Sequence, residues 1–159
     1  MDDAAIARAI HVLAVVIWIG GVAMVTLVLL PAVRRFKSAG ERIAFFEAVE
    51  GRFARQSRAT TLLAGLSGFY LVNRLDVWGR FAHASYWWMH AMVGVWALFT
   101  LMLFVAEPLF LHRLFQARAE RAPEATFTLI TRLHRVLLGF SVLTILGAVA
   151  GAHGLSFFG

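Results

Sequence analysis

Four apolar stretches, each long enough to cross a lipid bilayer, constrain the fold of this chain more than any other feature. They cover about residues 9–33, 59–78, 86–111 and 129–151. A spanning helix needs about 20 apolar residues, and its backbone polar groups must be satisfied within the helix because lipid offers no partner. The sequence therefore predicts an all-α fold, an integral membrane antiparallel four-helix bundle that forms a single transmembrane domain over residues 1–159.

The composition supports this class and removes several others. Hydrophobic residues make up 60% of the chain, charged residues only 15%, and cysteine is absent. Without thiols there is no disulfide, thiolate zinc site or cysteine-ligated iron–sulfur cluster. The first apolar stretch exceeds the roughly 7–15 apolar residues of a secretory signal. It also follows Asp2 and Asp3, so we expect it to remain in the mature protein.

The distribution of basic residues predicts the topology. Twelve of the fifteen Lys and Arg residues lie between residues 34 and 58 or between 113 and 135, and the other three are Arg8, Arg74 and Arg80. Positive charge collects in the cytoplasm. We therefore expect a multi-pass protein of the bacterial inner (cytoplasmic) membrane with both termini periplasmic. The charge of +6 is explained by topology, and no nucleic-acid partner is expected.

The first basic connection contains a segment of about residues 40–55 whose apolar residues recur at helical spacing. Ile43, Phe46, Val49 and Phe53 would share one face of a helix. This pattern predicts an amphipathic segment that lies at the cytoplasmic interface of the membrane.

Two histidines occur at matching depth in two of the apolar stretches. His11 and His90 each lie about one turn inside the end that should face the periplasm. An ionisable residue within a membrane span is costly and indicates a functional site. Two imidazoles on facing helices can ligate a haem iron from both sides. We therefore predict one haem b between the first and third spans, with His11 and His90 as the metal ligands.

Small and aromatic residues near these histidines complete the predicted cofactor site. At 100° per residue, Gly94 and Ala97 share a face with His90, which would leave room for a flat macrocycle, and Trp18 shares a face with His11. Gly65 and Gly68 form a small-residue stripe on the second span. The alternative is that these glycines only let helices pack closely, as small residues do in many membrane proteins.

The cytoplasmic half contains a second candidate set. His134 and His112 are each followed by an arginine, Arg135 and Arg113, that would pair with the propionates of a second haem. The alternative is that the arginines are ordinary topology signals. Glu107 is the one acid near lipid depth. Its alternatives are proton transfer and an ion pair with Arg58 or Arg132, and the ion pair is favoured.

Other chemistries find little support. No glycine-rich phosphate loop, H-E-x-x-H or G-x-S-x-G motif occurs. The methionines show no repeated M-x-x-M spacing, which disfavours transport of Cu(I). Because Met89 and Met92 flank His90, copper stays open as the alternative cofactor.

Two motifs resemble a known family. H-V-L-A-V-V-I-W-I-G-G at 11–21, followed by Pro31, resembles the first helix of HemJ and CopD-like membrane proteins, and W-M-H at 88–90 resembles their third-helix W-x-H. The resemblance to HemJ implies a helical membrane protein that binds haem b and takes part in the oxidation of protoporphyrinogen. The resemblance to CopD-like domains implies copper handling.

The chain departs from HemJ proteins at two places. Met92 stands where they have a lysine two residues after the third-helix histidine. The fourth span reads Arg132-Leu133-His134-Arg135 in place of an R-x-N-E type motif. We therefore carry over the fold and the His11/His90 pair, but not the enzymatic activity.

The leading hypothesis is a membrane-embedded b-type cytochrome-like protein that exchanges electrons with a quinone or a partner redox protein. The alternatives are a CopD-like copper-binding or transport component, a HemJ-type protoporphyrinogen oxidase and a cofactor-free scaffold subunit. Each of these alternatives places the protein in the lipid bilayer, and assembly into a homo-oligomer stays open.

Overall fold

The computed structural model describes residues 3–155, with the side chains of Ala39 and His112 outside the described part. Every regular element in this range is helical. The elements are α1 (Asp3–Met24), η1 (Val25–Leu29), α2 (Leu30–Phe36), α3 (Ala39–Arg74), η2 (Trp78–Ala82), η3 (Ala84–Tyr86), α4 (Trp87–Leu101), η4 (Met102–Leu111), α5 (His112–Arg121) and α6 (Pro123–Ala152). The all-α class predicted from the sequence is confirmed.

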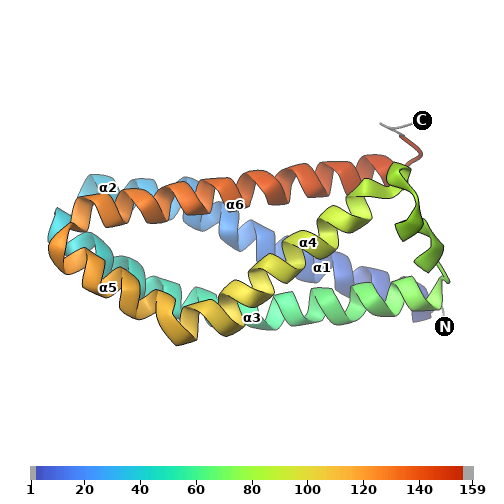
Figure 1. Cartoon of the computed structure of the whole chain (residues 1–159), viewed down its shortest axis with the longest axis horizontal. Coiled ribbons are helices and arrows are strands. Elements are labelled where there is room, and N and C mark those ends of the chain that lie inside the picture. The colour runs from blue at the N-terminus through green and yellow to red at the C-terminus, as the bar shows by residue number, and fades with distance from the viewer. Residues whose placement is uncertain (1–2, 156–159) are drawn as a thin grey trace.

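The long helices run back and forth along one axis (Figure 1). α1 begins and α6 ends at the same end of the molecule, where η2 and η3 also lie. The α2–α3 connection and α5 lie at the opposite end. This second end holds most of the arginines, and we call it the arginine-rich end.

Three helical segments within the described residues are long and apolar enough to cross a membrane. They are Asp3–Phe36, Ala84–Leu111 and Pro123–Ala152, and they overlap the predicted spans 9–33, 86–111 and 129–151. Large apolar side chains on them are exposed, such as Leu13 at 60% and Leu143 at 61%. Exposed apolar surface of this extent is typical of a chain that meets lipid.

The predicted span 59–78 is not apolar enough over a sufficient length to be among these segments. A bundle of four spanning helices is therefore not confirmed. α3 ends at Arg74, so the last residues of the predicted span lie in a turn. The uncharged part of the helix, residues 59–72, gives roughly 20 Å of rise at 1.5 Å per residue. Hydroxyl residues and glycines lower its hydropathy further.

The amphipathic segment predicted at 40–55 is the first half of α3 and continues directly into its apolar half. Ser38 caps the helix, and its N–H donates to the Glu41 carboxylate at 3.1 Å. The Ser38 hydroxyl, which donates to the same carboxylate, and this N–H together hold the pKa of Glu41 below its ordinary value. Ile43 and Phe46 are buried as the helical spacing requires.

Two core clusters hold the helices together, and α1 packs mainly along α3 while α4 packs mainly along α6. The central cluster contains Ala14, Trp18, Ile19, Val22, Ala64, Phe99 and Leu138. The cluster at the arginine-rich end contains Val25, Leu30, Val33, Ile43, Phe46, Phe127 and Ile130. Apolar contacts therefore run along the whole axis.

Two segments of the spanning helices have wide π-helical turns. η4 contains Pro108, and η1 ends at Leu29, two residues before Pro31 in α2. A proline inside a helix lacks the N–H of the regular bond and clashes with the preceding turn. A wide turn accommodates that ring without breaking the helix.

Candidate functional site

The His11 ring is half-buried between α1 and α3. Its Nδ1 lies 2.9 Å from the carbonyl oxygen of Ala64 and 3.1 Å from Oγ of Ser67. A carbonyl only accepts, so Nδ1 carries the hydrogen and the neutral ring has its lone pair on Nε2. Gly68 makes room for the ring, because a Cβ built there would lie 3.0 Å from Cε1 of His11.

His90 is exposed in the first turn of α4. Its Nε2 donates to the carbonyl oxygen of Phe81 at 3.0 Å, and the two rings meet edge to face with centroids 5.3 Å apart. The lone pair of neutral His90 is therefore on Nδ1. His90 shares its face of α4 with exposed Gly94, whereas Met89 on another face is 4% exposed.

The described contacts do not bring His11 and His90 together. The hydrogen-bond partners of His11 lie on α3, and the partner of His90 lies in η2. α1 and α4 meet deeper in the molecule, where the rings of Trp18 and Phe99 pack perpendicular with centroids 5.0 Å apart. Shared ligation by the two histidines thus stays a prediction.

The small residues of the predicted cofactor site fall into two groups. A Cβ at Gly65 would lie 2.5 Å from Nε1 of Trp96, and that nitrogen donates to the carbonyl oxygen of Thr61 at 3.0 Å. The space at Gly65 and Gly68 is thus filled by side chains of the protein itself. By contrast, a Cβ at Gly94 would meet nothing within 4 Å. The half-buried Ala97 lies one turn further along α4.

Of the two histidines predicted to bind a second haem, the structure describes the side chain of His134 only. His134 is half-buried on α6, where Nδ1 donates to the Ile130 carbonyl at 2.9 Å, and its ring packs edge-on against Phe46 at 5.6 Å. Its Nε2 therefore has a free lone pair. The side chain of His112 lies outside the described part of the structure, so the proposed partnership of the two histidines stays a prediction.

The copper alternative finds no assembled ligand set. His90 is exposed and Met89 is buried on a different face of α4. Among the residues that the structure describes, no group of three or more His, Cys, Asp or Glu side chains is positioned to hold a metal ion. A haem iron needs only one or two axial ligands from the protein, because the porphyrin supplies the others. The absence of a group of three ligands therefore argues against a copper site but not against haem.

An acidic cluster lies where α3 meets η4. Arg58 forms an ion pair with Glu107 and donates from Nε to the Leu103 carbonyl at 3.0 Å. This confirms the ion pair expected for Glu107. Burial, together with the nearby charges of Glu107 and Glu47, raises the pKa of Glu50 to about 7.

Glu50 was not among the residues predicted from the sequence, although its spacing relative to two hydroxyl residues indicates a polar face of the helix. Glu50, Ser57 and Thr61 follow one another at intervals of seven and four residues, which places them on one face of α3. Ser57 and Thr61 are 2% and 0% exposed. Their hydroxyls and the Trp18 indole N–H have no hydrogen-bond partner among the described residues. Between Glu50 and Thr61, the inward face of α3 therefore contains polar side chains as well as apolar ones.

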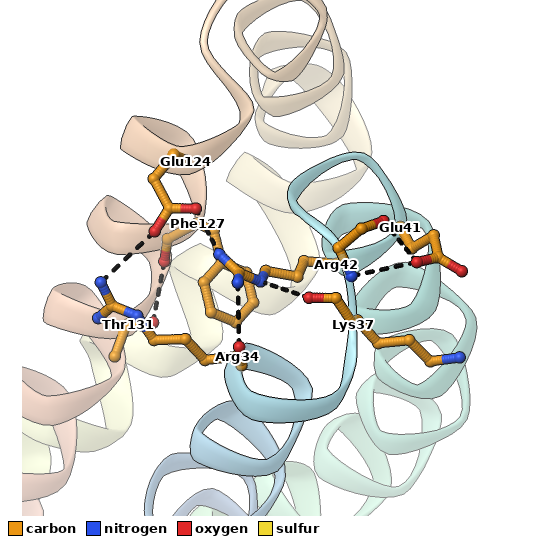
Figure 2. A network of polar contacts seen from close by, with 8 residues as sticks. Arg34, Lys37, Glu41, Arg42, Glu124, Phe127 and Thr131 are labelled. Atoms are coloured by element: carbon orange, nitrogen blue, oxygen red, sulfur yellow. Dashed lines mark hydrogen bonds and ion pairs between the residues drawn. The ribbon is translucent and has the colours of Figure 1, made fainter.

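The arginine-rich end is held by a polar network around Glu124 (Figure 2). Arg42 forms an ion pair with Glu124, and Arg34 reaches the same carboxylate at 3.4 Å. Arg42 also donates to the carbonyl oxygens of Arg34 and Lys37, at 3.0 Å each. The network ties the α2–α3 connection to the first turn of α6.

Comparisons with known proteins identify no relative. No protein-family model, curated protein or solved structure gives a significant match to the chain.

Proposed function

We propose that the protein is a membrane-embedded b-type cytochrome-like protein that binds haem b and passes single electrons. In this proposal the uncharged half of α3 crosses the membrane as a fourth helix beside the three apolar ones. The arginine-rich end faces the cytoplasm of a bacterial cell, in accordance with the charge asymmetry of the chain. The electron partner is a quinone or a redox protein.

The observation that carries the proposal is the hydrogen bond from His11 to α3. Metal-ligating histidines usually donate their other ring N–H to a carbonyl or carboxylate, which fixes the tautomer and the ring orientation. The Nδ1 of His11 does so to Ala64 at 2.9 Å, which leaves Nε2 available to an iron. The tautomer and the fixed ring orientation therefore support His11 as an axial ligand.

His90 fits the second axial position less directly. Its Nε2 is engaged by the Phe81 carbonyl, so ligation through Nε2 requires the ring to leave that oxygen. Gly94 on the same face is exposed and a Cβ there would meet nothing within 4 Å, so no protein side chain blocks a flat group on this outer side of α4. Haem would supply a one-electron ferric–ferrous couple. The chain's own contribution is to orient the ligands and, through Trp18 and Phe99, to exclude water.

The absorption spectrum of the full-length protein tests this function. We expect protein purified from haem-supplemented cells to show a Soret band and, when reduced, the α band of a b-type haem. His11→Ala should lose most of the haem per mole of protein, whereas His83→Ala, an exposed histidine ahead of α4, should retain it.

Two results would refute the proposal. One is wild-type protein that folds and purifies without a Soret band under these conditions. The other is a His11→Ala variant with an unchanged reduced spectrum. In the first case, metal analysis of the same sample separates the copper-binding alternative from a cofactor-free scaffold.

A further inference from the structure

A cavity at the arginine-rich end combines positive charge with an apolar wall. It has a volume of about 250 Å³ and is lined by Leu30, Pro31, Arg34, Arg35, Thr131 and Arg135. Three arginines from two helices that are far apart in the sequence, α2 and α6, thus line one cavity. None of the described residues that line this cavity is acidic.

The charge of the cavity is only partly neutralised by neighbouring groups. Arg34 shares Glu124 with Arg42, so one carboxylate serves two guanidinium groups (Figure 2). Arg35 lies over the Phe36 ring at 5.4 Å, a contact that leaves its N–H donors free for other partners. Arginine is the residue best suited to phosphate, because its planar fork donates two parallel hydrogen bonds.

The position of the cavity beside an apolar surface favours the phosphate of a lipid over a free phosphate ion. Leu30 and Pro31 lie near the arginine-rich end of the apolar segment Asp3–Phe36. Leu27 and Val28, within about one turn of Pro31, are 66% and 62% exposed. Charged residues above an exposed apolar surface match the headgroup and acyl chain of a lipid. Basic pockets between helices on the cytoplasmic side are typical sites for anionic lipids.

We propose that this cavity binds the phosphate group of an anionic membrane lipid through Arg34, Arg35 and Arg135. Thr131 donates its hydroxyl hydrogen to the Phe127 carbonyl at 2.9 Å, so the hydroxyl shapes the wall and does not donate to the phosphate. The site does not depend on haem, and its ligand need not enter the bundle.

Native mass spectrometry of the full chain in a neutral detergent tests the site. The probes are phosphatidylglycerol and phosphatidylcholine with the same acyl chains. We expect the wild type to retain phosphatidylglycerol in preference to phosphatidylcholine. Arg35→Gln and Arg135→Gln should each lower the affinity for phosphatidylglycerol about fivefold, the factor expected for one arginine near a charged lipid surface.

Arg132→Gln is the matched control, because it removes the same charge from the same helix outside the cavity lining. This variant should bind phosphatidylglycerol within about twofold of the wild type. Equal losses in all three variants would mean diffuse attraction to the basic end and would overturn the site. Unchanged binding in Arg35→Gln and Arg135→Gln would overturn it too. Displacement of the lipid by millimolar inorganic phosphate would reassign the cavity to free phosphate.

Discussion

Nδ1 of His11 on α1 donates a hydrogen bond to the carbonyl oxygen of Ala64 on α3, at a distance of 2.9 Å. The bond fixes the register of the two helices near one end of the molecule, where Arg74 also pairs with Asp3 at 3.0 Å. Towards the arginine-rich end the same pair of helices is set by Phe53, whose ring occupies the space left by Gly21. One histidine therefore both aligns two helices and keeps a free ring nitrogen.

Gly65→Ala should destabilise the protein. The new methyl group would lie 2.5 Å from Nε1 of Trp96 and would force the indole away from the Thr61 carbonyl. Overpacking of a core costs about 1–3 kcal/mol, so the melting temperature should fall by several degrees in thermal unfolding. Gly139→Ala is the control, because its Cβ meets nothing within 4 Å. This helix-favouring substitution should be neutral or slightly stabilising. Equal effects of the two substitutions would contradict the packing described for Trp96.

Glu50→Gln should stabilise the protein at high pH only. The pKa of Glu50 is raised from 4.5 to about 7, mainly by burial. The folded state therefore binds this proton more tightly than the unfolded state, and the stability falls as the pH rises from about 4.5 to about 7. The variant should melt several degrees higher than the wild type at pH 8 and no higher at pH 4.5. Glu120→Gln, on an exposed position of α5, should show no such difference. A Glu50→Gln protein with the same advantage at both pH values would rule out titration of this group.

The existence of the helices could be predicted from the sequence because long apolar runs leave few other folds. The span predicted at 59–78 is not confirmed over its whole length, for a physical reason. Leu75–Trp78 looks apolar but follows the end of α3, where Asp76 adopts a positive φ of 49°. The wide turns at Pro31 and Pro108 were not predicted, because a proline can equally end or kink a helix.

The candidate site was less predictable than the helices. The periodicity correctly placed His90 and Gly94 on one face of α4, but it could not say in which direction that face points. A helix that is apolar all round gives no preferred side. The orientation of α4 is set by specific packing, with Trp96 seated at Gly65 and Trp87 against Gly147. These contacts turn His90 outward.

The His90→Ala variant decides whether the two histidines form an axial pair. If both ligate haem, the iron is six-coordinate and low-spin, and removal of either imidazole should strongly reduce the b-type haem content. The measurement is haem per mole of protein together with the reduced spectrum. An unchanged reduced spectrum in His90→Ala, together with loss of haem in His11→Ala, would show that His90 is not an axial ligand. His153, directly after the end of α6 and at the same end of the molecule as His11, would then be the next candidate for the second ligand. His134 is too far away, because it packs on Phe46, about 27 Å along α3 from Ala64.

Reporter fusions test the topology. The arginine-rich end should face the cytoplasm, so a periplasmic alkaline phosphatase reporter fused after Gly159 should be active. The same reporter fused after Arg118 in α5 should be inactive, and a cytoplasmic reporter should give the reverse pattern at both positions. Activity of the cytoplasmic reporter at Gly159 would contradict an even number of crossings with periplasmic ends, and would favour a chain with three spans.

The protein should not replace a HemJ enzyme in a strain that lacks protoporphyrinogen oxidase. That reaction removes several electrons and protons from its substrate, so it needs a base or charge placed beside the haem. Met92 occupies the position where HemJ proteins have a lysine, and a thioether neither transfers protons nor pairs with a propionate. The acid-bearing motif of the fourth helix is replaced by His134-Arg135. We therefore expect no growth without added haem when the chain is expressed at the level of a HemJ control that restores growth. Growth under these conditions would show that the resemblance extends to the enzymatic activity, with catalytic groups other than those two positions.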